Sequence, residues 1–428
     1  MNRLIKVCAA LVFLSFVVLS TDGLAWPLDD ADSTRIRRLA FQRQAASGEF
    51  SIAGQPAGAR LATDDVDVRL TRSATFDLPG IDPGFTRSVV TLLADRADDY
   101  SVAVLDLTDP TSVAYAEHRA AVHYSPASLG KLLIALSWLQ ALADRYGDDH
   151  DARWRNLRAL EITADNLVSN DHHKVIHWDR TQASAQRRPL MPGDRGSLIE
   201  YLDWMLSASS NGAGSMLLKH GMLWRQFGTA YPRDAAAGKQ YFEGATAIQK
   251  SALLRDTLND AVLRNGLNPE DLYQGSFFTR DGRALVAGES SRANARELMR
   301  FLLHLEQGRL VDTFSSRVLK KLLYVTERRV RYAAAPALAD AAVYFKGGSW
   351  YRCEEEAGFE CGQYRGNVIN LMHSMAIVEA PAQSRRLHYL VVVMSNALRR
   401  NAAYDHQQLA SAIHGLIAAR NRARLPSH

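Results

Sequence analysis

Strand-like segments lie at both ends of residues 83–420, and a long stretch dominated by helical periodicity separates them. Near the N-terminal end, residues 100–107 are β-rich and residues 113–116 resume an extended pattern after a turn, which predicts a β-hairpin. Near the C-terminal end, three segments are typical of strands: residues 342–345, 368–372 and 389–394. We expect the two ends to meet in one antiparallel sheet, which constrains the chain to two lobes.

Helical periodicity precedes, separates and follows these strands. Apolar residues recur at helical spacing over residues 85–93 and again over residues 409–417. Five amphipathic segments fill the middle of the chain: residues 129–144, 198–206, 214–226, 246–264 and 293–306. The predicted fold class is therefore α/β, of the α+β type. Its antiparallel sheet comes from residues of about 83–125 and 325–420, helices flank the sheet, and residues of about 126–324 form an inserted all-helical lobe.

The first 25 residues have the pattern of a secretory signal peptide. A start that contains Arg3 and Lys6 precedes an apolar run from Val7 to Leu19, and small residues follow at a cleavable spacing. The run is shorter than the roughly 20 apolar residues that a transmembrane helix needs. We expect an exported protein, periplasmic or secreted, that has no stable membrane span after cleavage, with an uncleaved anchor as the alternative.

Residues 26–82 lack sustained apolar periodicity and are interpreted as an N-terminal extension, with one short strand at residues 66–70. The formal net charge of the chain is +5 at pH 7, and its basic residues are spread without a Lys/Arg-rich run. Nucleic-acid binding is therefore not expected.

Cys353 and Cys361 lie eight residues apart in a segment whose glycines allow the chain to turn back on itself. In an oxidising compartment the two thiols can pair, so we predict a disulfide. Free buried thiols and a two-cysteine metal site are the alternatives.

Ser128 and Lys131 lie at the start of an amphipathic segment with the spacing Ser-x-x-Lys. Residues three apart share one face of a helix, so the lysine can reach the serine. A serine hydroxyl becomes a good nucleophile when a neighbouring base takes its proton, and a desolvated lysine can be that base. The helix N-terminus also favours negative charge on an attacked carbonyl oxygen. A capping serine beside a solvated lysine is the alternative interpretation.

Ser209 and Asn211 lie on a polar break between two apolar helical segments. Such a break can point a hydroxyl and an amide into a cleft, although an ordinary helix N-cap has the same residue types. Farther along, Lys346 ends a strand and is followed by Gly347 and Gly348. Glycines there let a substrate backbone approach the strand edge, and a strand that simply ends in a turn is the alternative.

In this order, the three motifs resemble those of the class A β-lactamase and penicillin-binding-protein superfamily, whose signature is Ser-x-x-Lys, Ser-Asp-Asn and Lys-Thr-Gly. The resemblance covers about residues 83–420. It implies a β-lactamase-like fold without a cofactor or a metal. It also implies that Ser128 is the acylated nucleophile, that Lys131 is its base or proton shuttle, and that Ser209 relays a proton to the leaving nitrogen.

The same resemblance assigns the substrate-binding residues. Asn211 would bond the substrate amide, Lys346 would attract the substrate carboxylate, and Gly348 would let the substrate approach. The backbone N–H groups of Ser128 and Ser349 would form the oxyanion hole.

The sequence departs from the signature at three places. Ser210 replaces the usual aspartate, and Gly347 replaces a residue whose hydroxyl would bond the substrate carboxylate. Ser349, two residues farther along, is the candidate to replace that hydroxyl. The glutamate that deacylates class A enzymes has no clear counterpart. Glu270 is the nearest candidate for that base, with Glu289 after it, and a solvated loop acid is the alternative.

His173 and His177 have the i, i+4 spacing of helical zinc ligands. We interpret their segment instead as a polar surface helix or a helix at the rim of the cleft, because the resemblance requires no metal. Trp350 follows the third motif directly and can flank a substrate.

The predicted function is an exported serine hydrolase that acts through an acyl-enzyme on a β-lactam or on a peptidoglycan-derived peptide amide. The alternative is a catalytically weak binding or sensor protein that is acylated without turnover. Glutaminase activity, known among superfamily relatives, ranks third.

Overall fold

The structure is a computed structural model that describes residues 34–46, 56–71, 75–179, 182, 184–232, 234–327 and 329–422. The predicted signal peptide lies outside these residues. Within these ranges, no helix is both long and apolar enough to cross a membrane.

Five antiparallel strands form the main sheet, in the order β2-β1-β11-β10-β9. Their bounds are Tyr100–Asp106 for β1, Ala114–His118 for β2, Ala342–Arg352 for β9, Ile369–Ala380 for β10 and Leu387–Asn396 for β11. The N-terminal hairpin joins the C-terminal strands through β1 and β11, where Val104 lies opposite Val391. The prediction of one sheet built from both chain ends is confirmed.

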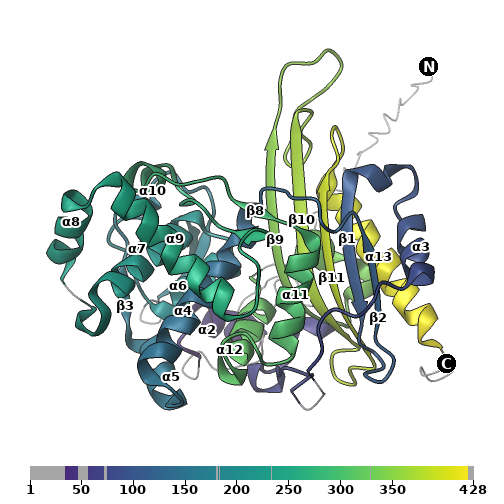
Figure 1. The fold of residues 1–428 in the computed structure, drawn as a ribbon, viewed down its shortest axis with the longest axis horizontal. Helices are drawn as coiled ribbons and strands as arrows, with labels where there is room; N and C mark the ends of the chain where they lie inside the picture. The colour runs from purple at the N-terminus through teal and green to yellow at the C-terminus, as the bar shows by residue number, and fades with distance from the viewer. Residues whose placement is uncertain are drawn as a thin grey trace, which may run out of the picture.

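Helices cover both faces of this sheet, which explains why its central strands β1, β10 and β11 are buried along almost their whole length. Helices α3 (Pro83–Thr91) and α13 (Ala402–Arg420) lie on one side, and α11 (Ala295–Glu306) and α12 (Thr313–Tyr324) pack against the other (Figure 1). Because successive side chains of a strand alternate, Val391 contributes to the core beneath α13, and its neighbour Leu390 contributes to the opposite core.

The second lobe is mainly helical and lies beyond the edge strand β9 (Figure 1). Its helices are α4 (Lys131–Tyr146), α5 (His150–Ala159), α6 (Leu198–Leu206), α7 (Asn211–Phe227), α8 (Ala235–Gly244), α9 (Ala247–Arg264) and α10 (Arg280–Leu285). The lobe also contains three two-stranded sheets, which the expectation of an all-helical lobe omitted. They pair β3 (Glu161–Thr163) with β6 (Arg195–Ser197), β4 (Val175–Asp179) with β5 (Ser184–Arg188), and β7 (Leu272–Tyr273) with β8 (Arg292–Ala293).

The interpretation of the His173–His177 segment as a helix is wrong. His177 belongs to β4, where it pairs with Gln186 of β5, and His173 precedes the strand. The i, i+4 spacing was misleading because residues four apart also share one face of an extended strand.

The described part of the N-terminal extension, residues 34–46, 56–71 and 75–82, packs onto the folded domain. Helix α2 (Arg38–Ala46) buries Leu39, and the Arg38 guanidinium forms a fully buried ion pair with Asp203, at 2.6 Å. The short strand expected at residues 66–70 is absent from this described part of the chain. That segment instead packs Val66 into the core, and its backbone bonds to groups outside any sheet.

A buried charge cluster lies between the helices and the sheet. Lys320 of α12 places its Nζ 2.5 Å from Glu306 Oε1 and 2.7 Å from Glu379 Oε1. All three side chains are fully buried, so each charge has a partner of opposite sign in place of water.

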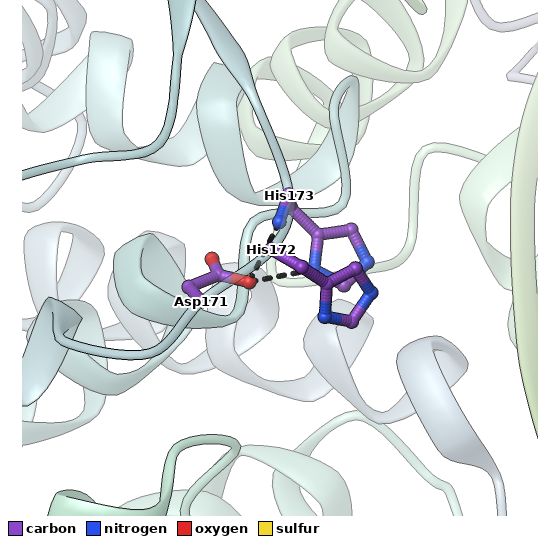
Figure 2. Close-up of side chains that lie close together, drawn as sticks. All are labelled: Asp171, His172 and His173. Carbon is purple, nitrogen blue, oxygen red and sulfur yellow. Dashed lines mark hydrogen bonds and ion pairs between the residues drawn. The ribbon is translucent and has the colours of Figure 1, made fainter.

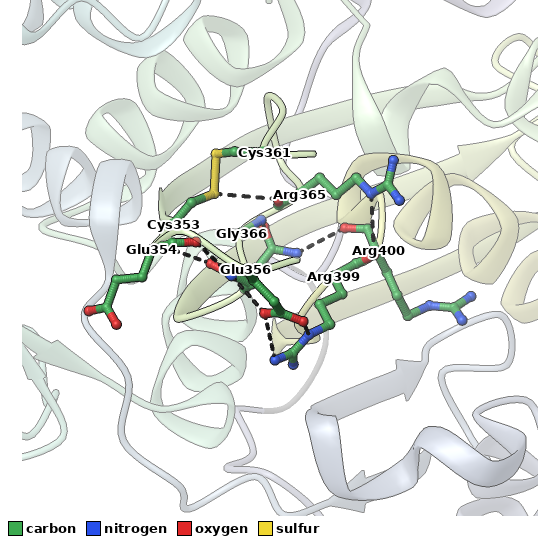
Figure 3. The surroundings of a disulfide bond; sticks show 10 residues. Cys353, Glu354, Glu356, Cys361, Arg365, Gly366, Arg399 and Arg400 are labelled. Atoms are coloured by element: carbon green, nitrogen blue, oxygen red, sulfur yellow. Dashed lines mark hydrogen bonds and ion pairs between the residues drawn. A yellow bond between two sulfur atoms is a disulfide. The ribbon is translucent and has the colours of Figure 1, made fainter. Parts of the chain in front are cut away.

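A disulfide joins Cys353 and Cys361, as predicted, in the connection that leads from β9 to β10 (Figure 3). An ion pair between Glu356 and Arg399, with N–O distances of 2.8 and 2.9 Å, ties the same connection to the segment after β11. The cross-link therefore restrains the chain directly after the strand that carries Lys346.

Candidate active site

A cleft of about 890 Å³ lies between β9 and the helical lobe. The three sequence motifs meet there, since the cleft is lined by Ser128, Ser209, Asn211, Lys346 and Ser349, among others. Residues 218 positions apart in the chain thus converge because the sheet closes the two chain ends around the helical insert.

Ser128 lies in a short 3-10 helix, Ala127–Gly130, that leads directly into α4. Ala127, the preceding residue, has a positive φ of 47°, which is a sparsely populated conformation for a residue with a side chain. Backbone strain of this kind is maintained where the surrounding structure holds a reactive group in place.

Lys131 is the first residue of α4 and is fully buried. Its Nζ lies 3.1 Å from Ser128 Oγ, and it donates to the Ser209 carbonyl oxygen at 2.6 Å and to Asn211 Oδ1 at 2.7 Å. Phe278 covers the amine, with its ring centroid 4.8 Å from Nζ. Burial lowers the pKa of Lys131 from 10.5 to about 7, although the charge of Asp171 opposes the shift. The lysine can therefore take a proton from Ser128 near neutral pH.

The second motif forms the turn before α7. Ser209 has a positive φ of 61°, and Ser210 caps the helix by accepting a hydrogen bond from the Ala213 amide at 3.0 Å. This turn places Ser209 Oγ between two lysines, 2.8 Å from Lys346 Nζ and 3.5 Å from Lys131 Nζ. A hydroxyl in that position can pass a proton between them and a leaving group.

Asp171 lies beneath this turn. Its Oδ2 accepts hydrogen bonds from Ser210 Oγ at 2.9 Å and from the Gly212 amide at 2.8 Å. Its Oδ1 lies 3.0 Å from the His173 backbone nitrogen and 2.7 Å from His173 Nδ1 (Figure 2). The sequence contains this residue beside two histidines, but spacing alone did not connect it with a motif about 40 residues away.

Lys346 is buried on the face of β9 that points to the helical lobe. Burial, with the nearby charges of Lys131 and Arg331, lowers the pKa of Lys346 well below its ordinary value. A bound carboxylate would favour the ammonium form, so the site can gain an ion pair when an anionic group arrives.

Arg331 takes the space of the hydroxyl that Gly347 lacks. A Cβ added at Gly347 would lie 2.8 Å from Arg331 Nη1. The guanidinium instead donates to Ser349 Oγ at 2.8 Å and stacks over the ring of Tyr364 at 4.9 Å. Ser349 therefore lines the cleft together with a cation that the sequence motifs did not reveal.

Gly348 permits a close approach between β9 and the backbone of Ser128. A Cβ at this position would lie 2.8 Å from the Pro126 carbonyl oxygen and 3.0 Å from the Ser128 amide nitrogen. The strand backbone therefore lies beside the Ser128 amide, which is the arrangement that an oxyanion hole shared by Ser128 and Ser349 requires.

Comparison with known proteins agrees with this geometry. A sequence profile described as "Beta-lactamase enzyme family" matches residues 84–417. The chain belongs to the β-lactamase enzyme family. It is thus a serine hydrolase of the β-lactamase and penicillin-binding-protein type.

Solved structures share the β-lactamase fold. A class A β-lactamase representative from Bacteroides cellulosilyticus DSM 14838 has 16% identity and a TM-score of 0.51, and the match covers 79% of this chain and 96% of that one. The TLA-3 extended-spectrum β-lactamase has 12% identity and a TM-score of 0.50, with coverage of 78% and 98%. At these identities the likeness shows the fold alone. No curated protein sequence matches the chain significantly.

Within this β-lactamase-family site, Glu270 does not occupy the place predicted for a deacylating base. Its side chain is 80% exposed and pairs with Arg292, with an N–O distance of 3.0 Å. Glu289 accepts a hydrogen bond from Tyr273 at 3.1 Å. Neither residue lines the cleft in the described part of the chain. The loop that contains both residues places Gln274, instead of Glu270, against the short helix Ala127–Gly130.

Gln274 is the loop residue that sequence reasoning missed. It is buried in the cleft wall, its Nε2 donates to the Ser276 carbonyl oxygen at 2.6 Å, and its amide carbonyl lies against Gly130. A Cβ at Gly130 would overlap that carbonyl, so the glycine admits the loop close to Ser128. An amide cannot act as a general base as a carboxylate does.

Proposed function

We propose that this protein cleaves a β-lactam or a peptidoglycan-like amide through an acyl-enzyme on Ser128, with Lys131 as the base. The observation that supports the proposal is the 3.1 Å distance from Lys131 Nζ to Ser128 Oγ in a buried site whose other acceptors are neutral. In such a site the lysine can be an amine at neutral pH, and the serine can be its proton donor.

The remaining groups support the later parts of acylation. Ser128 Oγ attacks the carbonyl carbon while its proton moves to Lys131, and the backbone N–H groups of Ser128 and Ser349 stabilise the oxyanion. The oxyanion then collapses and the C–N bond breaks, while the proton held by Lys131 passes through the Ser209 hydroxyl, 3.5 Å away, to the leaving nitrogen. A substrate carboxylate would bind near Lys346, and its charge would raise the pKa of that lysine.

A second candidate function is acylation without efficient turnover. Among the described residues that line the cleft, Glu327 is the one acidic side chain, and it is buried in an ion pair with Arg187 at 3.1 Å. A carboxylate held in this way is not free to activate water beside Ser128. This observation favours slow deacylation.

Mass spectrometry of the purified protein with benzylpenicillin, followed over time, tests both functions. The expected result is one covalent adduct on Ser128 in the wild type and none in Ser128→Ala. Loss of the adduct with formation of hydrolysed product supports the hydrolase, and a persistent adduct supports the binding protein. The absence of any adduct would contradict both for β-lactams.

Glu270→Gln tests the base that the sequence suggested. We expect the lifetime of the adduct to change by less than about twofold, because an exposed ion pair contributes little. A lifetime prolonged tenfold or more would restore Glu270 as a catalytic group.

We also propose that the protein is exported, since the basic start and apolar run of the first 25 residues have the form of a signal peptide. Amino-terminal sequencing of protein recovered from a periplasmic fraction tests this. Protein that keeps Met1 and stays in the cytoplasm would contradict it.

A further inference from the structure

The second motif lacks a carboxylate in its own sequence, yet a carboxylate lies against it in space. Ser210 stands where the signature has an aspartate. Asp171, which comes from the loop before β4, reaches the turn and binds both Ser210 Oγ and the Gly212 amide through one oxygen. The other oxygen binds the ring of His173 (Figure 2). His173 is one of the residues that line the cleft.

We propose that Asp171 is a positioning residue of this active site: one oxygen holds the second motif in place, and the other presents the imidazole of His173 to the substrate. The inference rests on the proposed function, because it assigns how that site is held and what part of the substrate it contacts.

The first interaction, in which Asp171 binds the second motif, acts through the turn before α7. Ser210 Oγ accepts from the Ala213 amide and donates to Asp171, so the helix cap itself is anchored on the carboxylate. The residues on either side of Ser210 are the ligands of the Lys131 amine: the Ser209 carbonyl oxygen and Asn211 Oδ1. A shift of the cap therefore changes the position of both acceptors relative to Lys131.

The second interaction, between Asp171 and the His173 ring, fixes the orientation and tautomer of His173. Burial opposes ionisation of Asp171, but hydrogen bonds from His173 and Gly212 hold its pKa well below the ordinary value. The ionised carboxylate is only an acceptor, so Nδ1 of His173 carries the proton. Burial lowers the pKa of His173 to about 4, which leaves the ring neutral at pH 7. Within the described chain no group bonds to its Nε2, which is therefore an acceptor available to a substrate N–H or O–H.

A metal site is the competing interpretation, because potential ligand atoms of Asp171, His172 and His173 lie within 4.8 Å of one another. The hydrogen bonds argue against it. The two oxygens of Asp171 face four donors, which fills the roughly four lone-pair sites of a carboxylate. A cation would have to displace the bonds that hold the helix cap.

The interaction of Asp171 with the second motif can be tested apart from its interaction with His173. For this test a carboxylate is placed at position 210, where the signature has an aspartate. We would measure the rate of acylation by benzylpenicillin as a function of concentration in the wild type, Asp171→Asn and the double variant Asp171→Asn/Ser210→Asp. Asp171→Asn is expected to lower the maximal rate about tenfold or more, because the turn loses a charged acceptor. The double variant should recover the maximal rate to within about threefold, since it restores a carboxylate at the helix cap.

The pH dependence distinguishes positioning from a loss of folding. The negative charge of Asp171 raises the pKa of Lys131, so its removal should move the acidic limb of the acylation rate to lower pH. The double variant should move the limb back toward the wild-type position. A merely destabilised protein would lose active molecules without moving the limb.

The contact between His173 and the substrate is tested separately. His173→Ala should raise the benzylpenicillin concentration for half-maximal acylation about threefold or more, since that substrate carries a side-chain N–H donor. The corresponding value for p-nitrophenyl acetate, which has no such donor, should stay unchanged. His123→Ala is the matched control, because His123 also pairs with an aspartate, Asp271 at 2.8 Å, but lies outside the cleft lining.

Wild-type protein that benzylpenicillin never acylates would overturn the proposed function for β-lactams and this inference with it. An acylated wild type would leave the proposed function standing. In that case, equal maximal rates for the wild type and Asp171→Asn, or a double variant no faster than Asp171→Asn, would overturn the inference alone. If His173→Ala leaves the benzylpenicillin concentration for half-maximal acylation unchanged, His173 does not contact the substrate, and that part of the inference is wrong.

Discussion

Two buried lysines of this protein have the same side chain and the same burial but different partners. Lys320 is enclosed between the carboxylates of Glu306 and Glu379. Lys131 has a hydroxyl, a carbonyl oxygen and a side-chain amide oxygen as its contacts. An ammonium paired with two carboxylates stabilises structure, whereas an amine among neutral acceptors is free to exchange a proton. The partners of a buried lysine, more than its burial, therefore determine whether it stabilises the structure or exchanges a proton.

The largest effect is expected from changes at Lys131 and at its partner Ser128. Ser128→Ala, Lys131→Ala and the double variant should each lower turnover by about a thousandfold or more, to a similar level, because groups that act as one unit are not additive. Hydrolysis of a chromogenic cephalosporin and of a small activated ester measures this, with circular dichroism as the folding control. A folded Ser128→Ala protein with the wild-type rate would exclude Ser128 as the nucleophile for that substrate.

The structural lysine should show the reverse behaviour. Lys320→Met removes the cation that Glu306 and Glu379 share. Arg385, 3.4 Å from Glu379, and His388, 3.5 Å from Glu306, are more distant partners. The change should therefore still lower the free energy of unfolding, by about 3 kcal/mol or more. Urea unfolding measures this, and the acylation rate of the remaining folded protein should not change. Lys321→Met is the control, because Lys321 pairs with an exposed aspartate at 3.3 Å. Equal losses in the two variants would refute the stabilising role.

Lys346 tests the case between these two, a lysine that gains its carboxylate only from the substrate. Lys346→Ala should raise the apparent KM for a carboxylate-bearing β-lactam by about tenfold to a hundredfold, the effect of about 1.5–3 kcal/mol for a charged hydrogen bond. The apparent KM of a neutral ester should change much less. Equal losses on both substrates would indicate a proton-transfer or structural role instead.

The smallest effect is a matter of pH. Because the pKa of Lys131 is lowered to about 7, the amine form is dominant above that pH and is lost as the pH falls below it. The acylation rate should therefore fall about tenfold per pH unit on the acidic side. Stopped-flow acylation between pH 5 and 8 measures this, and a flat profile would show that Lys131 is not the base.

The sequence predicted the parts of the site that depend on local order. Ser128 with Lys131, the polar break at Ser209, and Lys346 before two glycines are each short patterns, and the strand order brings them together. The sheet was predictable for the same reason, because its apolar strands lie at both chain ends with helical periodicity between them.

The missed features all depend on contacts between distant segments. Asp171 reaches the second motif from another loop, and Arg331 fills the space left by Gly347. The position of Glu270 also depends on the fold. Its place in the sequence suggests a deacylating base, but the path of its loop turns its side chain to solvent and brings Gln274 to the cleft.

The family match begins at residue 84, but residues 34–46 and 56–71, which precede it, contribute side chains to the core. Arg38 binds Asp203 of the helical lobe, and the Asp67 carbonyl oxygen accepts from Lys320 beneath the sheet. The N-terminal segment is therefore a strap that crosses both lobes. A chain shortened to the recognisable family boundary would expose apolar core surface and leave Asp203 as an unpaired buried charge. The part of the chain that must fold together is therefore longer than the part that the family profile matches, residues 84–417.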